Sequence, residues 1–287
     1  MKKVLYLINP ISGRKNKNKL PELIKKYSDK INPEIRFTEY AGHAIEICKN
    51  EHQNYDAIIA VGGDGSVNEI AQSLVHTNTT MGIIPSGSGN GFSNSLGIPE
   101  NHKKAVQIIN NYRTKKIDLV KINDKIFDNV AGIGFDALIA HKFAVAGKRG
   151  FISYLKIIIK QLRKYKGVDY KFVLDDDKII ENKSFFLLIA NGNQWGNKAQ
   201  ISPSSQLDDG LLNIVILNNF PARAAVPLLI KLYSKKIENS KYIQTFTCKK
   251  IVIEKNGKIE AHIDGEPVFF EDKIEIEILP KSLNVIY

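Results

Sequence analysis

The sequence has only two cysteines and no long apolar run. Cys48 and Cys248 lie far apart and are too few for a disulfide-rich scaffold. The first apolar run, residues 4–8, has only five residues. The apolar part of a secretory signal needs roughly 7–15 residues, so we expect no signal peptide. No stretch approaches the roughly 18 apolar residues of a membrane-spanning helix. We therefore expect a reduced, cytoplasmic protein that does not span a membrane.

Acidic residues are fewer than basic ones. The 287 residues include 41 Lys and Arg against 30 Asp and Glu, a formal net charge of +11. The hydrophobic fraction of 43% and the charged fraction of 25% are typical of a globular chain, which excludes a disordered or collagen-like protein. The positive excess favours an anionic partner, either nucleic acid or lipid and nucleotide phosphates.

Two observations weigh against nucleic acid as that partner. The sequence contains no helix-turn-helix, zinc-finger, RRM or KH motif. Its six histidines show no metal-ligand spacing with either cysteine, so the sequence does not predict a zinc-bound nucleic-acid module. We therefore expect lipid headgroups and a nucleotide as partners, and no nucleic acid.

The first 120 residues alternate strand and helix patterns. The expected strands are residues 4–8, 34–39, 56–61 and 81–84, and the expected helices are residues 20–27, 44–49, 67–74 and 106–111. Strands that alternate with helices at this spacing predict a parallel sheet covered on both faces.

After residue 117 the pattern changes to β-branched strands separated by turns. The expected strands include residues 116–122, 126–130, 170–174, 179–189, 212–217, 245–254, 258–263 and 274–279, with helical insertions at 136–166 and 222–233. We therefore expect an α/β fold in two parts. An N-terminal Rossmann-like parallel-sheet domain spans residues 1–117, and a C-terminal antiparallel β-sandwich domain spans residues 118–280. Residues 281–287 return to the first domain.

Three loops rich in glycine and serine follow strands of the first domain. The sharpest is Gly62-Gly63-Asp64-Gly65-Ser66, which lies between a strand and a helix. Glycines allow a backbone to approach a ligand closely, and the N–H groups that open the next helix favour phosphate. The other two loops are residues 9–13 and 87–91. Ligands gather at the carboxyl ends of parallel strands, so we expect the three loops to converge on one phosphate site. None has the Walker A or dinucleotide-binding spacing.

Five motifs occur in a recognisable order. They are Asn9-Pro-x-Ser-Gly13, Gly62-Gly-Asp-Gly-Ser66, Gly87-Ser-Gly-Asn90, Leu207-Asp-Asp-Gly-Leu211 and Asp264-Gly-Glu266. In this order the chain resembles the diacylglycerol kinase catalytic-domain family, which includes bacterial lipid kinases and the sphingosine and ceramide kinases. The resemblance covers essentially the whole chain. It implies a fold shared with NAD kinase, and an ATP- and Mg²⁺-dependent kinase that phosphorylates a lipid hydroxyl in phospholipid metabolism.

The resemblance also implies roles for individual residues. The nucleotide site would consist of Asn9, Ser12, Thr38, Gly62, Gly63, Asp64, Gly65, Ser66, Val67, Asn68, Glu69, Gly87, Ser88, Asn90 and Asp118. Asp264 or Glu266 would act as general base on the lipid hydroxyl, with Asp64 as a further catalytic residue. A structural metal would bind Asp209 and the backbone carbonyls of Gln206 and Leu211. One position departs from the family pattern, because Gly91 stands where many bacterial diacylglycerol kinases have aspartate.

The acidic pair Asp264 and Glu266 has two interpretations. On an extended strand, residues two apart face the same side, and Gly265 leaves room beside them. Such a pair could hold a proton acceptor against a hydroxyl. The alternative is an ordinary hairpin turn, for which Asp-Gly is typical.

Residues 141–167 contain eight basic residues and no acid. On a helix, Lys156, Lys160 and Lys164 share one side, and Ile158 and Leu162 lie on the other. We expect the basic helix at 148–166 to make peripheral contact with an anionic membrane. The alternative is a surface helix whose apolar side packs on the sandwich. A homodimer is compatible with the sequence, which does not give the oligomeric state.

The sequence therefore favours a two-domain lipid kinase that works at a membrane surface. A NAD kinase is the alternative with a soluble substrate, since it shares the Gly-Gly-Asp-Gly loop. A protein that only binds a nucleotide or lipid is the other alternative. The acceptor stays open between a diacylglycerol-like lipid and a sphingoid base.

Overall fold

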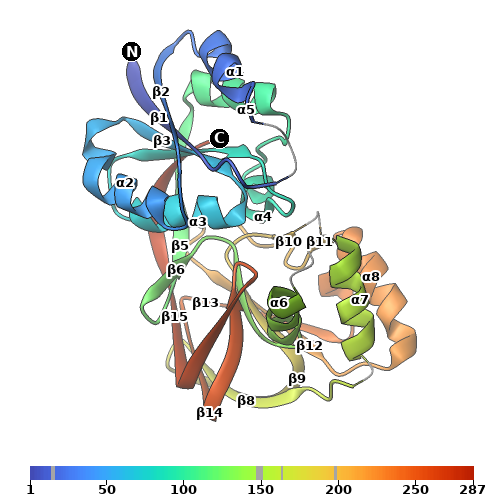
Figure 1. Ribbon diagram of the computed structural model, residues 1–287. Helices are drawn as coiled ribbons and strands as arrows, with labels where there is room; N and C mark the ends of the chain where they lie inside the picture. Colours follow the sequence, from blue (N-terminus) through green and yellow to red (C-terminus); the bar gives the residue numbers. More distant parts are fainter. Residues whose placement is uncertain (14–16, 147–150, 163, 197–198) are drawn as a thin grey trace. The chain divides into compact units, whose positions relative to one another are not determined.

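The computed structural model describes residues 1–13, 17–146, 151–162, 164–196 and 199–287 (Figure 1). The chain forms two compact units. The first contains Met1–Leu119 together with Pro280–Tyr287, and the second contains Val120–Leu279. The sequence pattern had set the change at residue 117 and the start of the returning segment at residue 281.

The first unit contains a parallel sheet in the order β15-β4-β3-β1-β2. Its strands are β1 (Lys2–Ile8), β2 (Ile31–Phe37), β3 (Ala57–Gly62), β4 (Thr80–Pro85) and the end of β15 (Glu266–Ile286). Val285 of β15 pairs with Met81 of β4, so the end of the chain completes this sheet. The parallel sheet predicted from the alternating pattern is confirmed.

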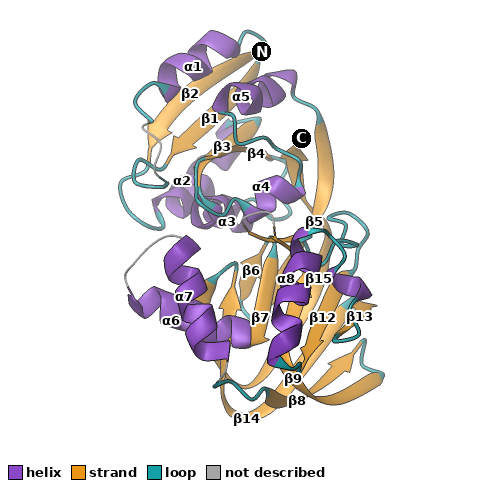
Figure 2. Cartoon of the chain, turned by 90° about the vertical axis from the view of Figure 1, so that its right-hand side faces the viewer, coloured by secondary structure: helices purple, strands orange, loops and turns teal. Residues whose placement is uncertain are grey.

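Helices cover both faces of this sheet. They are α1 (Leu20–Tyr27), α2 (His43–Glu51), the short η1 (His52–Asn54), α3 (Asp64–Ser73), α4 (Gly91–Ser95) and α5 (His102–Asn111). Helix α1 packs with α5, and α2 packs with α3 on the other face, as Figures 1 and 2 both show. The whole of β3 is buried, which explains why its sequence is apolar without alternation.

The second unit is mainly antiparallel. Its strands are the end of β5 (Thr114–Ile122), β6 (Lys125–Phe127), β7 (Val130–Gly134), β8 (Val168–Leu174), β9 (Lys178–Ala190), β10 (Gln194–Gly196), β11 (Ala199–Gln200), β12 (Leu212–Asn218), β13 (Ile243–Cys248), β14 (Lys250–Ile263) and the first part of β15. The main order is β13-β12-β9-β7-β14-β15. Strands β9 and β14 each pair with β7 near one end and with β8 near the other, so the sheet folds over on itself.

Two apolar clusters lie on opposite faces of β9 and β12. Along β9, Leu187 and Ile189 belong to the cluster enclosed by strands, whereas Phe186 and Leu188 belong to the second cluster. This second cluster is covered by α6 (Phe135–Ala146), α7 (Phe151–Leu162) and α8 (Ala225–Tyr233), with the short η2 (Ala222–Ala224) and η3 (Ile237–Asn239) beside α8. The antiparallel sandwich predicted for this half is confirmed.

One predicted strand was wrong. The run at 245–254 divides into β13, which pairs with β12, and β14, which pairs with β8 and β15. The carboxylate of Asp175 accepts hydrogen bonds from the backbone N–H groups of Lys249 and Lys250 at 2.8 and 2.9 Å. These bonds fix the chain at the point where it leaves one strand partner for another.

The basic helix predicted at 148–166 is shorter in the structure. Helix α7 spans Phe151–Leu162, and Tyr165 beyond it contacts Phe135 and Phe185, with ring centroids 5.4 and 5.1 Å away. Gly167 then adopts a φ of +78° and leads into β8. Residues 148–150 and 163 lie outside the described residues. In the part of the chain that the structure describes, no helix is long and apolar enough to cross a membrane.

Candidate functional sites

The first two glycine loops are joined by Asn9. It follows β1, and its Nδ2 atom donates a hydrogen bond to Oγ of Ser66 at 2.9 Å. Its Oδ1 atom accepts the N–H of Ile11 at 3.1 Å, which fixes the bend of the first loop. The Asn9 side chain therefore fixes the backbone of the first loop and also binds the Ser66 hydroxyl of the second loop.

The third loop packs against both of the others. The N–H of Ser86, just before this loop, donates to the carbonyl of Gly62 at 2.7 Å. Gly13 has a φ of +67°, and a Cβ atom there would lie 1.9 Å from the carbonyl oxygen of Ser86. A Cβ atom on Gly87 would lie 2.5 Å from Cα of Gly63. The predicted convergence of the three loops is therefore present, and it depends on glycine at these contacts.

Asp64 links the second loop to the third through both carboxylate oxygens. Oδ2 accepts the N–H of Asn90 at 2.9 Å, and Oδ1 accepts the N–H of Gly91 at 2.8 Å. Burial raises the pKa of the Asp64 carboxyl, and backbone N–H groups, first those of Gly91 and Asn90, oppose that rise. In this geometry Asp64 anchors the third loop. The residue that departs from the family pattern, Gly91, contributes its backbone to this contact.

Lys17 is a buried cation beside the first loop, and the sequence argument did not single it out. Only 4% of it is exposed. Its ammonium donates to the carbonyl oxygens of Asn9 and Ser12 and to the Ser12 hydroxyl. All three acceptors are uncharged, and burial lowers the pKa of Lys17 to about 8. In the sequence Lys17 is one more basic residue, and no local pattern indicates that it is buried.

Other predicted nucleotide residues lie around these loops. Thr38 is buried at the end of β2, where its N–H donates to the carbonyl of Ile8 at 2.9 Å. Ser88 is exposed at the tip of the third loop. Val67 lies in the apolar core, so its side chain faces away from solvent. Gly65 and Asn68 belong to the first turns of α3.

Two predicted acids of the first unit have structural partners. Oε1 of Glu69 accepts the N–H of Gly42 at 3.0 Å, at the start of α2. Asp118 is fully buried, and its Oδ1 atom accepts the N–H of Lys281 at 2.7 Å. Asp118 therefore fixes the returning end of the chain to β5.

In the second unit, Asp264 and Gly265 form the turn between β14 and β15. Their φ angles are +48° and +85°, and the flanking residues Ile263 and Glu266 are paired. This two-residue hairpin corrects the extended-strand interpretation of the acidic pair. Positive φ at both turn positions favours Asp-Gly, because the matching turn twists with the strands. Glu266 is exposed at the start of β15.

The carboxylate of Asp264 is held by backbone groups. Oδ1 accepts the N–H groups of Asn129 and Val130 at 3.2 and 2.9 Å, and Oδ2 accepts that of Asp128 at 3.3 Å. The N–H of Asp264 in turn donates to the carbonyl of Val130 at 2.8 Å. The turn is therefore fastened to the residues that lead into β7.

A buried pair supports the same turn from behind. The N–H of Gly265 donates to Nδ1 of His262 at 3.3 Å, and Nε2 of His262 lies 3.0 Å from Oδ2 of Asp136. Because Nδ1 accepts, the ring proton lies on Nε2 and is donated to Asp136. Gly132 makes room for this pair, since a Cβ atom there would lie 1.9 Å from Oδ2 of Asp136. No motif in the sequence indicated this contact.

The predicted metal loop forms a turn at Gly210, whose φ is +74°. Oδ1 of Asp209 accepts the N–H of Leu211 at 3.0 Å. Within the described ranges, no group of three or more metal-ligating side chains occurs. A metal bound by Asp209 and the carbonyls of Gln206 and Leu211 stays a prediction.

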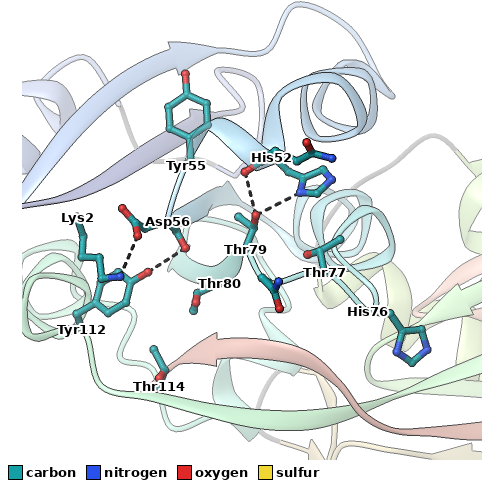
Figure 3. A pocket seen from close by; sticks show the side chains of 12 residues that line it. Lys2, His52, Tyr55, Asp56, His76, Thr77, Thr79, Thr80, Tyr112 and Thr114 are labelled. Carbon is teal, nitrogen blue, oxygen red and sulfur yellow. Dashed lines mark hydrogen bonds and ion pairs between the residues drawn. The ribbon is translucent and has the colours of Figure 1, made fainter.

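A separate cavity of about 690 Å³ lies at the amino ends of the strands of the first unit (Figure 3). Lys2 and Asp56 line it, with Nζ and Oδ1 2.9 Å apart, and the hydroxyl of Tyr112 donates to the carbonyl of Asp56 at 2.9 Å. The glycine loops follow the carboxyl ends of the same strands. This cavity therefore lies at the edge of the sheet where ligands of parallel sheets are not usually bound.

Family comparisons agree with this arrangement. Residues 3–122 match the family model described as the diacylglycerol kinase catalytic domain. Residues 129–287 match the model of the YegS C-terminal NAD kinase beta sandwich-like domain. The chain belongs to the diacylglycerol kinase catalytic-domain family.

Relatives of this family member include a diacylglycerol kinase of Bacillus subtilis (strain 168). The two are 28% identical over 281 residues, which cover 93% of this chain and 90% of the relative. A crystal structure of a Bacillus anthracis (strain Sterne) protein is 27% identical, with a TM-score of 0.81, and covers 100% of this chain and 97% of that chain. An NAD kinase from Archaeoglobus fulgidus, solved with ATP, shares the fold at a TM-score of 0.52 and 15% identity, over 100% of this chain and 94% of that chain.

Proposed function

We propose that this protein is an ATP-dependent kinase that phosphorylates a hydroxyl group of a membrane lipid. The observation that carries the proposal is the convergence of three glycine loops around Asp64. Membership of the diacylglycerol kinase catalytic-domain family supports the lipid as acceptor. Diacylglycerol-like lipids and sphingoid bases both stay open.

The glycine loops supply what a nucleotide triphosphate needs. Helix α3 begins at Asp64, and the first N–H groups of a helix have no partner within it, so they favour phosphate. Ser66 carries a hydroxyl in the first turn of this helix, and Ser12 carries one in the first loop. Lys17 adds a buried positive charge behind the first loop. Phosphoryl transfer depends on such positioning and charge compensation more than on covalent help from the protein.

A Mg²⁺ ion fits this set of donors. Magnesium in phosphoryl-transfer sites is usually held by one or two carboxylates, water and the phosphates themselves. Asp64 supplies a carboxylate among these donors, and backbone N–H groups hold it in place. Asp64 would therefore be the protein carboxylate that holds the ion. When bound, Mg²⁺ would neutralise phosphate charge during transfer.

The turn at Asp264 would serve the acceptor hydroxyl. Asp264 is held rigidly by three backbone N–H groups, whereas Glu266 is exposed next to it. One of these carboxylates would take the proton of the hydroxyl as its oxygen attacks the terminal phosphorus. The three hydrogen bonds fix the position of the Asp264 carboxylate, whereas the Glu266 side chain is not held in this way.

The acceptor would be reached at a membrane. We propose peripheral contact of the cytoplasmic protein with anionic lipid through the basic segment 148–166, as a monomer or a homodimer. Lys160 and Lys164 are exposed, and Ile158 and Leu162 pack on the helix-covered cluster. This division of sides leaves the lysines free to contact lipid phosphates while the apolar side stays on the protein core.

The test uses ATP labelled in its terminal phosphate, Mg²⁺ and mixed vesicles that contain diacylglycerol and a sphingoid base, with NAD in a parallel tube. We expect label in the organic phase, and the labelled lipid identifies the acceptor. Asp64→Ala serves as the control for contaminating kinases, because it removes the acceptor of two loop N–H groups and should abolish the label. Label on NAD alone would replace the proposal with a NAD kinase. If neither the lipids nor NAD becomes labelled, the result would favour a protein that only binds a nucleotide or a lipid.

A further inference from the structure

Helix α8 exposes an apolar stripe that no part of the described chain covers. Val226, Leu229, Ile230 and Tyr233 are 66%, 48%, 63% and 43% exposed. Their spacing of three, four and seven residues places them on one side of the helix. The other side, at Leu228 and Leu232, packs on the helix-covered cluster.

This exposure is concentrated. Among the described residues, thirteen large hydrophobic side chains are exposed, and four of them lie on this nine-residue helix. Exposed hydrophobic residues that occur singly are normal on a protein surface, whereas a contiguous stripe indicates a surface that contacts something apolar. An amphipathic helix folded against its own core would present polar residues at these positions.

The charges around the stripe identify the kind of partner. Residues 219–237 contain four basic residues and no acid. Arg223 is exposed before the helix, and Lys235 and Lys236 are exposed just after it. An apolar stripe with cations at both ends and a tyrosine at one end is the pattern of a helix that lies in the headgroup region of an anionic membrane. Basic flanks would instead repel a second copy of the same face.

Helix α8 can lie on a membrane but cannot cross one. At a rise of about 1.5 Å per residue, nine residues span less than half of the roughly 30 Å hydrocarbon core. Figures 1 and 2 both show α7 and α8 on the same face of the second unit, and both pack on the helix-covered cluster. Ile159 of α7 is 61% exposed on that layer.

We propose that α8 is a membrane-contact helix, with its apolar stripe at the acyl-chain boundary and its flanking cations on lipid phosphates. This surface is distinct from the basic segment 148–166. The proposal rests on the proposed function only in that a lipid acceptor gives membrane binding a purpose. Binding itself is measured without ATP, so failure of one proposal does not decide the other.

The experiment is sedimentation of the full chain with vesicles of equal parts phosphatidylcholine and phosphatidylglycerol. The variant Val226→Ser/Ile230→Ser replaces the two most exposed residues of the stripe. We expect its partition onto vesicles to fall by roughly tenfold or more, since burying one large aliphatic side chain corresponds to about that factor. Ile179→Ser is the matched control, because Ile179 is 61% exposed on β9, and it should bind like the wild type.

A second readout locates the contact. An environment-sensitive fluorophore on Leu229→Cys should shift its emission to the blue when vesicles are added, whereas the same label on Ile179→Cys should not. The native Cys48 and Cys248 are buried and do not compete for the label. Phosphorylation of a short-chain acceptor dispersed as monomers should be equal in the wild type and the double serine variant.

Two results would overturn the proposal. Unchanged vesicle binding of Val226→Ser/Ile230→Ser, with a label at position 229 that stays in water, would show that the stripe does not meet lipid. A wild type that is dimeric by light scattering and a double serine variant that is monomeric would make the stripe a self-association surface. If the wild type phosphorylates none of the lipids tested, the proposed function is contradicted and the vesicle-binding result remains valid.

Discussion

Nε2 of His262 lies 3.0 Å from Oδ2 of Asp136, and the two side chains are only 2% and 1% exposed. The other nitrogen of the same ring accepts the N–H of Gly265. A buried carboxylate is therefore connected through one imidazole to the turn that carries both candidate bases. Neither residue belongs to a motif, yet together they support the turn from behind.

His262→Ala should lower both stability and turnover. The change leaves Asp136 buried with one partner fewer, which costs about 2–4 kcal/mol of the free energy of unfolding. It also frees the N–H of Gly265, so kcat should fall more than KM for ATP rises. Urea unfolding and steady-state kinetics measure the two effects. His52→Ala is the comparison, because His52 bonds to Thr79 in the first unit, and it should leave kcat unchanged.

The variant Gly132→Ala tests the position of the Asp136 side chain without changing the charge of the His262–Asp136 pair. Gly132→Ala would place a methyl group 1.9 Å from the Asp136 carboxylate without altering any titratable group. We expect kcat to fall as it does in His262→Ala, because the pair must move. Normal kinetics in Gly132→Ala would show that the position of Asp136 does not matter to the reaction.

Gly13→Ala should destroy nucleotide binding through a steric effect. Its φ of +67° disfavours any side chain by roughly 1 kcal/mol, and the added Cβ would also meet the carbonyl oxygen of Ser86. Gly97→Ala is a matched control, because its φ is +74° and nothing lies within 4 Å of its Cβ position. Both variants should lose similar stability from backbone strain. Only Gly13→Ala should lose ATP affinity by calorimetry, and equal affinities would disprove the role of the loop contact.

Much of the fold could be predicted from local pattern. Helix α1 coincides with the predicted range 20–27, and the buried run of β3 ends at the predicted glycines. These features depend on residues that are neighbours in sequence. The division of residues 245–254 into two strands depends on Asp175, which is 74 residues from Lys249. No local pattern could contain that information.

The candidate site divides in the same way. The convergence of the glycine loops was predictable, because parallel strands bring their carboxyl ends to one edge. The pairing of His262 with Asp136 was not, since 126 residues separate them. The turn at Asp264 was one of two interpretations, and positive φ at Asp264 and Gly265 decided between them. Lys17 was visible as charge, but the burial that makes it unusual comes from tertiary packing.

The two candidate bases should differ in their effect on stability. Asp264→Ala removes the acceptor of three backbone N–H groups, so it should cost about 2 kcal/mol or more of the free energy of unfolding and abolish turnover. Glu266→Ala changes an exposed residue, so it should keep the stability and lose turnover. ATP binding should survive in both. Full activity in one variant would assign proton abstraction to the other residue, and activity in both would remove this turn from the mechanism.

The thiols should be inert in the folded protein. Burial raises the pKa of both Cys48 and Cys248 to about 12, so neither is a thiolate at neutral pH. A chromogenic disulfide reagent at pH 8 should therefore react with two thiols per chain only after unfolding in guanidinium. Rapid reaction of the native protein would show that one cysteine is reached by solvent.

Lys17 should make nucleotide affinity depend on pH. Burial lowers its pKa from 10.5 to about 8, so the ammonium is charged below pH 8 and becomes neutral above it. Phosphate favours the charged form, and affinity for ATP should therefore fall as the pH rises above about 8. Lys17→Met should bind ATP about tenfold more weakly at pH 7 and should lose this dependence, as the loss of about 1.4 kcal/mol of charge attraction implies.

Stability without nucleotide should change in the opposite direction. A lysine whose pKa is lower in the folded state binds fewer protons there than in the unfolded chain. The free energy of unfolding should therefore rise between about pH 8 and 10.5 in the wild type through this group, relative to Lys17→Met. Calorimetric titrations and urea unfolding across this range measure both slopes. Parallel slopes in wild type and variant would exclude Lys17 as the titrating group.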